Sequence, residues 1–247
     1  MISIAQLLTD NLGSWPELVT KNKIDYAKKH GYGFFSKTIK FPKDRHPSWY
    51  CIPHILDVFS FIEDGDWVFW SDIDSLIMKT DIELSSFIDE GYNFIVGMQG
   101  HGIIFNKRYS SCLNLGQFFI KNTDWSKHLL NEIWSWAEGK DCEWEPFWEN
   151  CVFNMFWKKD LCSFRKNSKI VPIRQFNSFH DIPERKRFSG GFTSWTNEYQ
   201  RYVFGDFIVH FSSKSNSERD ILVREYYKRV DAKTNDNHIE PIWWSVE

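Results

Sequence analysis

The chain has 247 residues, of which 42% are hydrophobic and 26% charged, and its formal net charge is −3 at pH 7. These values are ordinary for a soluble globular protein, and the length suits one large domain or two small ones. Because the charge is slightly negative and no block of basic residues occurs, the composition does not favour a nucleic acid or a membrane surface as a partner.

The five cysteines are widely spaced and form no Cys-x-x-Cys pair. This pattern argues against a disulfide framework and a structural zinc site and favours a reducing compartment. No stretch approaches the ~20 apolar residues of a membrane span, and the first residues lack the basic-then-apolar pattern of a signal peptide. We therefore expect a cytoplasmic or soluble protein, or a catalytic domain whose anchor lies outside this chain.

Strand and helix patterns alternate in the first part of the chain. They predict a first edge strand over residues 1–5, a helix over 16–30, a strand over 33–39 and a helix over 49–62. Pro16 suits the first position of a helix, and Gly31 stands where a helix C-cap is wanted. A polar loop bracketed by prolines separates the second strand from the second helix.

The rest of the chain continues this alternation. The patterns predict, in chain order, a strand over residues 67–70, a short helix over 81–90, a strand over 92–98, a flexible turn at 100–102, a strand over 113–121, helices over 124–136 and in the second half of 143–157, strands over 170–173 and 207–211, and a helix over 217–230. We therefore expect a single α/β domain over residues 1–230, with a mostly parallel central sheet flanked by helices. A polar C-terminal tail follows over residues 231–247.

Two carboxylates follow the most apolar strand. Residues 67–70 are four large apolar side chains in a row, which suits a strand covered on both faces. Asp72 and Asp74 come directly after it, at the edge where open α/β sheets bind ligands. In an extended chain both carboxylates project to the same side, where they repel unless a cation lies between them. Oxygen ligands select Mg²⁺ or Mn²⁺, ions that commonly bridge to substrate phosphates. An isolated Asp-x-Asp is otherwise a turn or a helix cap.

His210 lies inside the strand predicted over residues 207–211, and Lys214 follows shortly after it. Neutral imidazole is a common nitrogen ligand of Mn²⁺-like ions, so His210 is a candidate third metal ligand. The alternative is a hydrogen-bonded core histidine. Lys214 could reach the same diphosphate as a point charge, whereas a lysine is by default a solvated surface residue.

Four further residues could contact a substrate. Glu149 and Asn150 lie in a segment rich in Trp and Phe, where a carboxylate could bind sugar hydroxyls or simply cap a helix. Asn114 is either a turn residue or a ligand contact. Gly116 interrupts a strand, which usually marks a bulge or the close approach of another backbone or a ligand. No zinc-hydrolase, P-loop or nucleophile-elbow motif is present.

Four stretches together resemble glycosyltransferase family 34, the galactosyl-, xylosyl- and mannosyltransferase group with a GT-A fold. They are NKxxYAxxHGY at residues 22–32, WVFWSDIDSLI at 67–77, LNLGQFFIKN at 113–122 and GDFIVHF at 205–211. They occur in the order of the family and span most of the chain. The chain departs from the family's usual pattern at four places: it has Leu115 for Ser or Thr, Asn150 for Gln, Cys51 for Lys, and Ser212-Ser213 where a Gly is usual.

The resemblance implies a GT-A (Rossmann-like) catalytic domain over residues 1–230. It implies a retaining, metal-dependent enzyme that moves a hexose or pentose from a UDP- or GDP-linked donor to a hydroxyl of a glycan or glycoprotein. Asp74 and His210 would bind Mn²⁺ or Mg²⁺, with Asp72 on the metal or the donor. Lys214 would contact the diphosphate. The resemblance also implies substrate contacts at Asn114 and Gly116 and catalytic roles for Glu149, which would orient sugar hydroxyls, and Asn150, which would lie near the anomeric carbon.

Two other functions use the same features. A glycan-binding module could keep the fold and have lost turnover, although the presence of Asp72, Asp74 and His210 together disfavours it. A metal-dependent phosphoesterase could use the same carboxylates, but such enzymes usually need more clustered carboxylates or histidines than the sequence contains.

Overall fold

The computed structural model of the protein describes residues 1–105, 109–137, 148–180 and 200–232. The C-terminal tail predicted over residues 231–247 therefore lies almost entirely outside the described residues. The extent of the catalytic domain, residues 1–230, stays a prediction.

A six-stranded sheet forms the centre of the molecule, in the order β2-β1-β3-β6-β5-β7. Its strands are β1 (Ile2–Thr9), β2 (Gly33–Ile39), β3 (Trp67–Ser71), β5 (Phe94–Phe105), β6 (Tyr109–Lys121) and β7 (Ser168–Pro172). Only β6 runs antiparallel to its neighbours, and the pairings of β1 with β2, β1 with β3 and β5 with β7 are parallel. The mostly parallel sheet that the sequence predicts is confirmed.

A second, three-stranded sheet stands beside the first, in the order β4-β9-β8. It consists of β4 (Ser75–Ile77), β8 (Ser178–Phe179) and β9 (Ile208–His210). The chain leaves the large sheet at the end of β3 and enters the small sheet at the start of β4. The residues between these two strands therefore lie at the junction of the sheets.

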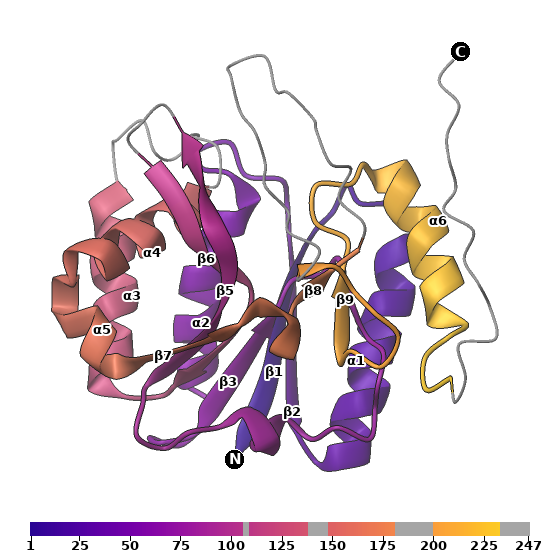
Figure 1. Cartoon of the computed structure of the whole chain (residues 1–247), viewed down its shortest axis with the longest axis horizontal. Coiled ribbons are helices and arrows are strands. Elements are labelled where there is room, and N and C mark those ends of the chain that lie inside the picture. Colours follow the sequence, from indigo (N-terminus) through magenta and orange to yellow (C-terminus); the bar gives the residue numbers. More distant parts are fainter. Residues whose placement is uncertain (106–108, 138–147, 181–199, 233–247) are drawn as a thin grey trace.

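Helices cover both sides of the sheets (Figure 1). Helices α2 (Cys51–Phe59), α3 (Asp124–Ala137), α4 (Trp148–Lys159) and α5 (Phe164–Asn167) pack on one face of the large sheet, and α1 (Trp15–His30) and α6 (Asn216–Tyr227) lie near the small sheet. Val68 and Trp70 face the first group, while Trp67 and Phe69 belong to the core on the opposite face. Strand β3 is therefore buried on both faces, as its unbroken apolar run predicts.

Several helix ends follow from local sequence signals. Gly31 ends α1 in the left-handed conformation at φ +70°, and its N–H donates to the carbonyl of Ala27. Glycine adopts this conformation without a steric penalty, so the predicted C-cap is confirmed. Helix α6 begins with a capping box in which the side chains of Ser215 and Glu218 each accept a hydrogen bond from the other's backbone N–H.

Three sequence predictions are wrong in detail. Strand β1 lies between β2 and β3 and is not an edge strand. The helix predicted over residues 81–90 is only a 3₁₀ turn, Leu84–Phe87, because serine and aspartate side chains there bond to nearby backbone groups instead. The turn predicted at residues 100–102 lies within β5, where the pairing with β6 shifts register between Met98 and Ile103.

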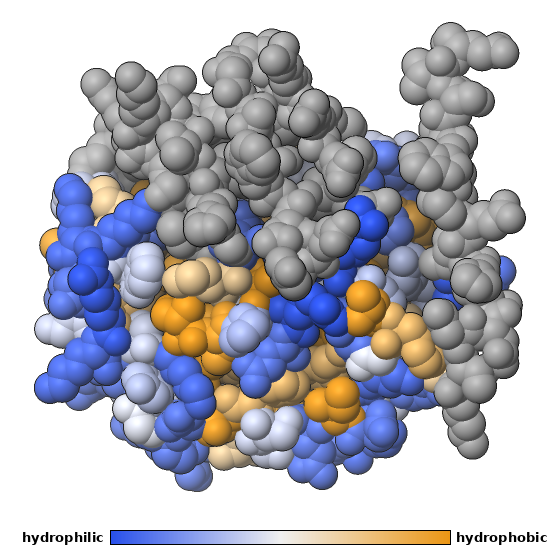
Figure 2. All heavy atoms as spheres, in the orientation of Figure 1, coloured by the Kyte–Doolittle hydropathy of each residue, from blue (hydrophilic) through white to orange (hydrophobic). Residues whose placement is uncertain are grey.

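Figure 2 shows hydrophobic side chains gathered in the middle of one face and hydrophilic ones at its margins. Among the described residues, the large hydrophobic side chains with substantial exposure come from several separate elements, and single residues of this kind are normal on a protein surface. Among the described residues, no helix combines the length and apolar character needed to cross a membrane.

Candidate metal and donor site

The candidate site begins with the turn that joins the two sheets. Asp72 and Asp74 flank this turn between β3 and β4, so the local chain is a turn and not the extended segment that the sequence suggests. Two backbone hydrogen bonds fix it: the N–H of Asp72 donates to the carbonyl of Gly116 at 2.8 Å, and the carbonyl of Asp74 accepts from the N–H of Phe211 at 2.8 Å. The turn is thus held by a strand of each sheet.

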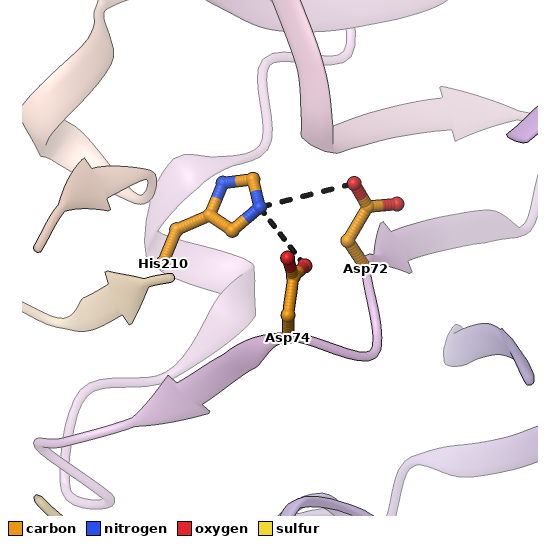
Figure 3. Close-up of side chains that lie close together, drawn as sticks. All are labelled: Asp72, Asp74 and His210. Carbon is orange, nitrogen blue, oxygen red and sulfur yellow. Dashed lines mark hydrogen bonds and ion pairs between the residues drawn. The ribbon is translucent and has the colours of Figure 1, made fainter. Parts of the chain in front are cut away.

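Strand pairing brings His210 to this turn. His210 is opposite Ser75 in the antiparallel pairing of β4 with β9, so it lies beside Asp74. Its Nε2 atom is 3.1 Å from Asp74 Oδ1 and 3.9 Å from Asp72 Oδ2, and both carboxylates point towards the imidazole ring (Figure 3). The indole N–H of Trp70 donates to Asp72 Oδ1 at 2.8 Å, which orients that carboxylate. The structure therefore brings the three predicted metal ligands together.

These three side chains fit a hard divalent cation. One ligand atom of each lies within 4.8 Å of the others, and two of the three donors are carboxylate oxygens. Oxygen donors with a single imidazole suit Mn²⁺ or Mg²⁺ better than the soft, sulfur-rich sets that other metals prefer. The donor set is thus suited to a hard divalent cation, as the sequence predicts.

The polar residues of the first sequence motif, residues 22–32, bond to the backbone that follows β3. The hydrogen-bonded pairs are Asn22 with both backbone groups of Ile77, Lys23 with the carbonyls of Ser71 and Asp72, Tyr26 with the carbonyl of Ile82, His30 with the carbonyl of Thr80, and Tyr32 with the N–H of Leu84. One face of α1 and the residues just after it therefore hold the segment that carries the two aspartates. The sequence shows this motif but does not reveal its role.

Lys23 is the most unusual member of this motif because its side chain is fully buried. Its ammonium group donates to the carbonyl oxygens of Ser71 at 3.1 Å and Asp72 at 2.7 Å. Burial lowers the pKa of Lys23 to about 7, and the charges of Asp72 and Asp74 partly oppose this shift. Sequence reasoning missed the residue because a lysine is almost never expected in a core.

A chain of side-chain amides fixes the orientation of His210. The backbone N–H of Gly116 can only donate, and it donates to Asn114 Oδ1 at 2.9 Å. The same oxygen accepts from Asn177 Nδ2 at 2.8 Å, which leaves Asn177 Oδ1 to face His210 Nδ1 at 2.9 Å. Because this oxygen can only accept, Nδ1 carries a proton, and Nε2 is the ring nitrogen that faces the aspartates and could bind a cation.

Asn177 and Asn114 therefore support the candidate metal ligand His210 through its Nδ1 atom. Asn177 is fully buried, and no sequence motif pointed to it. Asn114 also donates to Gln99 Oε1 at 2.9 Å, so three of its hydrogen-bonding positions are used within the protein. The predicted contact of Asn114 with substrate stays a prediction.

The imidazole ring of His210 leaves no room for a side chain at position 116. A Cβ atom at this position would lie 2.3 Å from His210 Cε1 and 2.8 Å from His210 Nδ1. The sequence predicted a close approach at this glycine, and the neighbour is the ring of His210. Whether Gly116 also contacts a substrate stays a prediction.

Arg219 joins the cluster from α6, and sequence reasoning missed it. Its guanidinium forms an ion pair with Asp74 Oδ2 at 2.7 Å. Burial alone would raise the pKa of Asp74, but the neighbouring His210 and Arg219 outweigh it and hold this pKa below its usual range. For Asp72, burial and then repulsion from Asp74 raise the pKa. The pKa of Asp74 is thus lowered, whereas that of Asp72 is raised.

Lys214 lies in the loop between β9 and α6 and is half-buried. The described residues offer its ammonium group no hydrogen bond or ion pair. Ser213, just before it, adopts a left-handed conformation at φ +63°, in the stretch where the family usually has a glycine. The structure does not bring Lys214 into contact with the three clustered ligands, and its predicted role towards a diphosphate stays a prediction.

Glu149 and Asn150 lie in the first turn of α4. Burial, with a smaller contribution from the charge of Asp72, raises the pKa of Glu149 to about 8, against a hydrogen bond from Ser48 that lowers it. Cys51 is buried nearby, and the charges of Glu149 and Asp72 contribute to its raised pKa. The thiol of Cys51 is uncharged, so this position supplies no cation beside Glu149.

Two solved structures with a similar arrangement of elements are glycosyltransferases. A glycosyltransferase involved in the glycosylation of the major capsid of PBCV-1 superposes with a TM-score of 0.63 at 14% identity, covering 90% of this chain and 99% of that chain. The galactosyltransferase LgtC, in complex with donor and acceptor sugar analogs, gives a TM-score of 0.53 at 14% identity, covering 96% and 98%. The protein therefore has the GT-A glycosyltransferase fold, as the resemblance implied.

The profile of the galactosyl transferase GMA12/MNN10 family, glycosyltransferase family 34, matches residues 9–90 and 89–220. The chain belongs to this family. It is 24% identical to an uncharacterized alpha-1,2-galactosyltransferase of Schizosaccharomyces pombe, over 83% of this chain and 65% of that protein. It is 24% identical to a probable alpha-1,6-mannosyltransferase of Saccharomyces cerevisiae, over 87% and 59%, and 32% identical to glycosyltransferase 6 of Arabidopsis thaliana, over 45% and 26%. The chain thus spans less than two thirds of the length of these relatives.

Proposed function

We propose that the protein is a metal-dependent, retaining glycosyltransferase that moves a hexose or pentose from a UDP- or GDP-linked donor to a hydroxyl of a glycan or glycoprotein. The observation that carries the proposal is the convergence of Asp72, Asp74 and His210 at the junction of two sheets in a chain of this family. Those residues lie at the carboxyl end of β3, where α/β folds bind nucleotides.

Asp74 and His210 would hold Mn²⁺ or Mg²⁺ directly, and Asp72 would bind the cation or the donor. The cation, when bound, would neutralise charge that develops on the departing diphosphate. His210 offers Nε2 because Asn177 fixes its tautomer from behind. Lys214 would add a second positive charge near the diphosphate from its loop after β9.

Asn114, Glu149 and Asn150 would contact the sugars. Asn114 has one amide hydrogen left for a donor hydroxyl after its bonds within the protein. With a pKa of about 8, Glu149 is mostly a neutral acid at pH 7, so it would donate a hydrogen bond to a sugar oxygen. Asn150 would lie near the anomeric carbon. Gly116 would serve the donor indirectly, by leaving room for His210.

A panel of UDP- and GDP-sugars with Mn²⁺ tests this function. Free nucleoside diphosphate is expected from at least one donor, and its yield is expected to rise with an added glycan acceptor. Binding of a glycan with no release of nucleotide would instead identify a non-catalytic module. Cleavage of simple phosphoesters would identify a phosphoesterase. The anomeric configuration of the product, read by NMR, then tests retention.

Asp74→Asn gives the sharpest variant for the same assay. The amide keeps the size of the side chain and can still accept from Arg219, but it lacks the negative charge of a carboxylate and therefore binds a hard cation more weakly. Mn²⁺-dependent turnover is expected to fall by at least about 100-fold, the scale of losing one electrostatic element of an active site. An Asp74→Asn protein that turns over donor at the wild-type rate removes the metal assignment.

A further inference from the structure

The ion pair between Arg219 and Asp74 has no role in the function proposed above. Arg219 Nη2 lies 2.7 Å from Asp74 Oδ2, while Asp74 Oδ1 faces His210. Both oxygens of this candidate metal ligand are therefore occupied by groups of the protein. A cation that binds Asp74 must compete with a permanent positive charge, because an arginine does not lose its proton in a protein.

The other contacts of Arg219 are weaker than this ion pair. Its Nε lies 3.4 Å from the carbonyl of Phe211, and its guanidinium carbon is 5.8 Å from the centre of the Trp15 ring. The side chain is 21% exposed, so part of it is accessible to solvent. Once its bond to Asp74 is lost, little else in the described structure holds the guanidinium in place.

The charge balance of the cluster predicts what replaces that bond. The two aspartates face Arg219 and, beneath the turn, the buried amine of Lys23, so a divalent cation would leave the cluster with an excess of positive charge. Like charges at such short range repel, and the repulsion is stronger in a partly buried site than in water. An anion that binds beside the cation would remove this excess, and the planar fork of an arginine suits phosphate oxygens.

We propose that Arg219 is a built-in counter-ion that couples the binding of the cation to that of the donor diphosphate. In the free protein the guanidinium neutralises Asp74 and weakens the binding of a cation alone. When the cation takes Asp74, the released guanidinium binds an oxygen of the diphosphate. The inference rests on the proposed function, because it takes the diphosphate of a sugar nucleotide as the anion.

The test measures Mn²⁺ binding to the full chain by electron paramagnetic resonance, first without nucleotide and then with saturating UDP or GDP. Arg219→Gln removes the charge, and Arg219→Lys keeps it without the planar fork. Arg224→Gln is the matched control, since Arg224 lies on the same helix and pairs with the exposed Asp220 away from the cluster. Thermal unfolding of each variant establishes that it is folded.

Arg219→Gln is expected to bind Mn²⁺ alone roughly tenfold more tightly than the wild type, within the usual range of coupling between two sites. The gain in Mn²⁺ affinity caused by the nucleotide is expected to shrink by a similar factor. Because coupling is reciprocal, the gain in nucleotide affinity caused by Mn²⁺ should shrink equally. The Mn²⁺ affinity of Arg219→Lys is expected to lie between those of the wild type and Arg219→Gln. Arg224→Gln is expected to bind Mn²⁺ like the wild type.

Two results would overturn the inference and leave the proposed function standing. In the first, Arg219→Gln binds Mn²⁺ no more tightly than the wild type when no nucleotide is present. The other is tighter Mn²⁺ binding with an unchanged effect of the nucleotide. If the wild-type protein binds no Mn²⁺ even with UDP or GDP, the metal-dependent function itself fails, and the inference fails with it.

Discussion

The turn from Asp72 to Asp74 and the start of α4 from Trp148 to Asn150 are the two ends of the candidate site, and they differ in how their polar groups are bonded. At the turn, backbone groups and carboxylates have partners from both sheets and from α1 and α6. At the start of α4, Glu149 Oε2 is buried and has no hydrogen-bond partner among the described residues. Trp148 has a strained φ of +39°.

This difference in hydrogen bonding suits the two ends of the site to different ligands. A cation site has to hold two mutually repelling carboxylates in place before the cation arrives, so a rigid surround is an advantage. A sugar, in contrast, brings hydroxyl groups that can bond to polar atoms left unpaired by the protein. The turn thus fits a preformed cation site, and the start of α4 fits a surface completed by a sugar.

The largest expected effect comes from Gly116→Ala, which tests whether the turn is as rigid as its bonding indicates. The new methyl group would lie 2.3 Å from His210 Cε1, so the imidazole must move away from the aspartates. We expect Mn²⁺ affinity to fall by at least about 100-fold, the upper end of the losses seen when a metal-binding histidine loses its support. Isothermal titration calorimetry measures it.

Gly91→Ala is the matched control for this variant. Gly91 is exposed, and an added Cβ would meet only the side chain of Asp89 at 3.3 Å. It is expected to bind Mn²⁺ like the wild type. If Gly116→Ala also binds like the wild type, the ring of His210 is not fixed where the structure places it, and the rigidity of the turn is disproved.

Asn177→Leu tests the amide chain behind His210. The substitution removes the oxygen that accepts from His210 Nδ1, so the ring is free to adopt the other tautomer or to rotate. Mn²⁺ affinity is expected to fall by about 10- to 100-fold. Asn177→Asp keeps an acceptor towards the ring but places a second oxygen against Asn114 Oδ1, so it should recover part of this loss. Equal affinities for the two variants would show that the hydrogen bond to Nδ1 does not matter.

Lys23→Met probes the buried support of the turn through the pH dependence of stability. Because the pKa of Lys23 is lowered to about 7 in the folded protein, the unfolded chain binds more protons between pH 7 and 10.5. Lys23 therefore makes the free energy of unfolding rise with pH across this window. The rise amounts to several kcal/mol, at roughly 1.4 kcal/mol per pKa unit.

Chemical denaturation at a series of pH values measures this effect. In Lys23→Met the rise between pH 7 and 10.5 should be lost, whereas the control Lys21→Met should keep it. Lys21 is two residues away on α1, and its ammonium is exposed and paired with Asp25. An unchanged profile in Lys23→Met would mean that the buried amine titrates as it does in water.

The sequence located the parts of the fold and site that depend on local patterns. The apolar run before Asp72 predicted a strand buried on both faces, and the resemblance connected that strand with His210. Asn177 and Arg219 could not be found in this way, because each is a common residue type whose partner is distant in the chain. Asn177 reaches the site because β8, which follows it, pairs with β9, and Arg219 reaches it through the packing of α6.

Lys23 shows a different limit of sequence reasoning. Its motif was visible, but a lysine in an amphipathic helix is normally assigned to the solvent face, and only the carbonyls of Ser71 and Asp72 make its burial tolerable. Two of the wrongly predicted elements, β1 and residues 100–102, are likewise decided by tertiary contacts. Residues 100–102 carry two glycines, which suggest a turn, but pairing with β6 keeps them within β5.

Glu149→Gln is expected to have the smallest effect, and it tests the other end of the site. The folded pKa of Glu149 is raised to about 8, so the folded protein binds more protons than the unfolded chain between pH 4.5 and 8. Stability from this group is therefore present at low pH and is lost as the pH rises through this window, opposite in sign to Lys23. Because Glu149 is only half-buried as a residue, water screens part of the effect. Glu149→Gln should remove this loss, so its melting temperature should gain on the wild type as the pH rises from 5 to 8. A constant difference across that range would mean that the carboxyl group is ionised throughout, and the proposed hydrogen bond from a neutral Glu149 to a sugar would then fail.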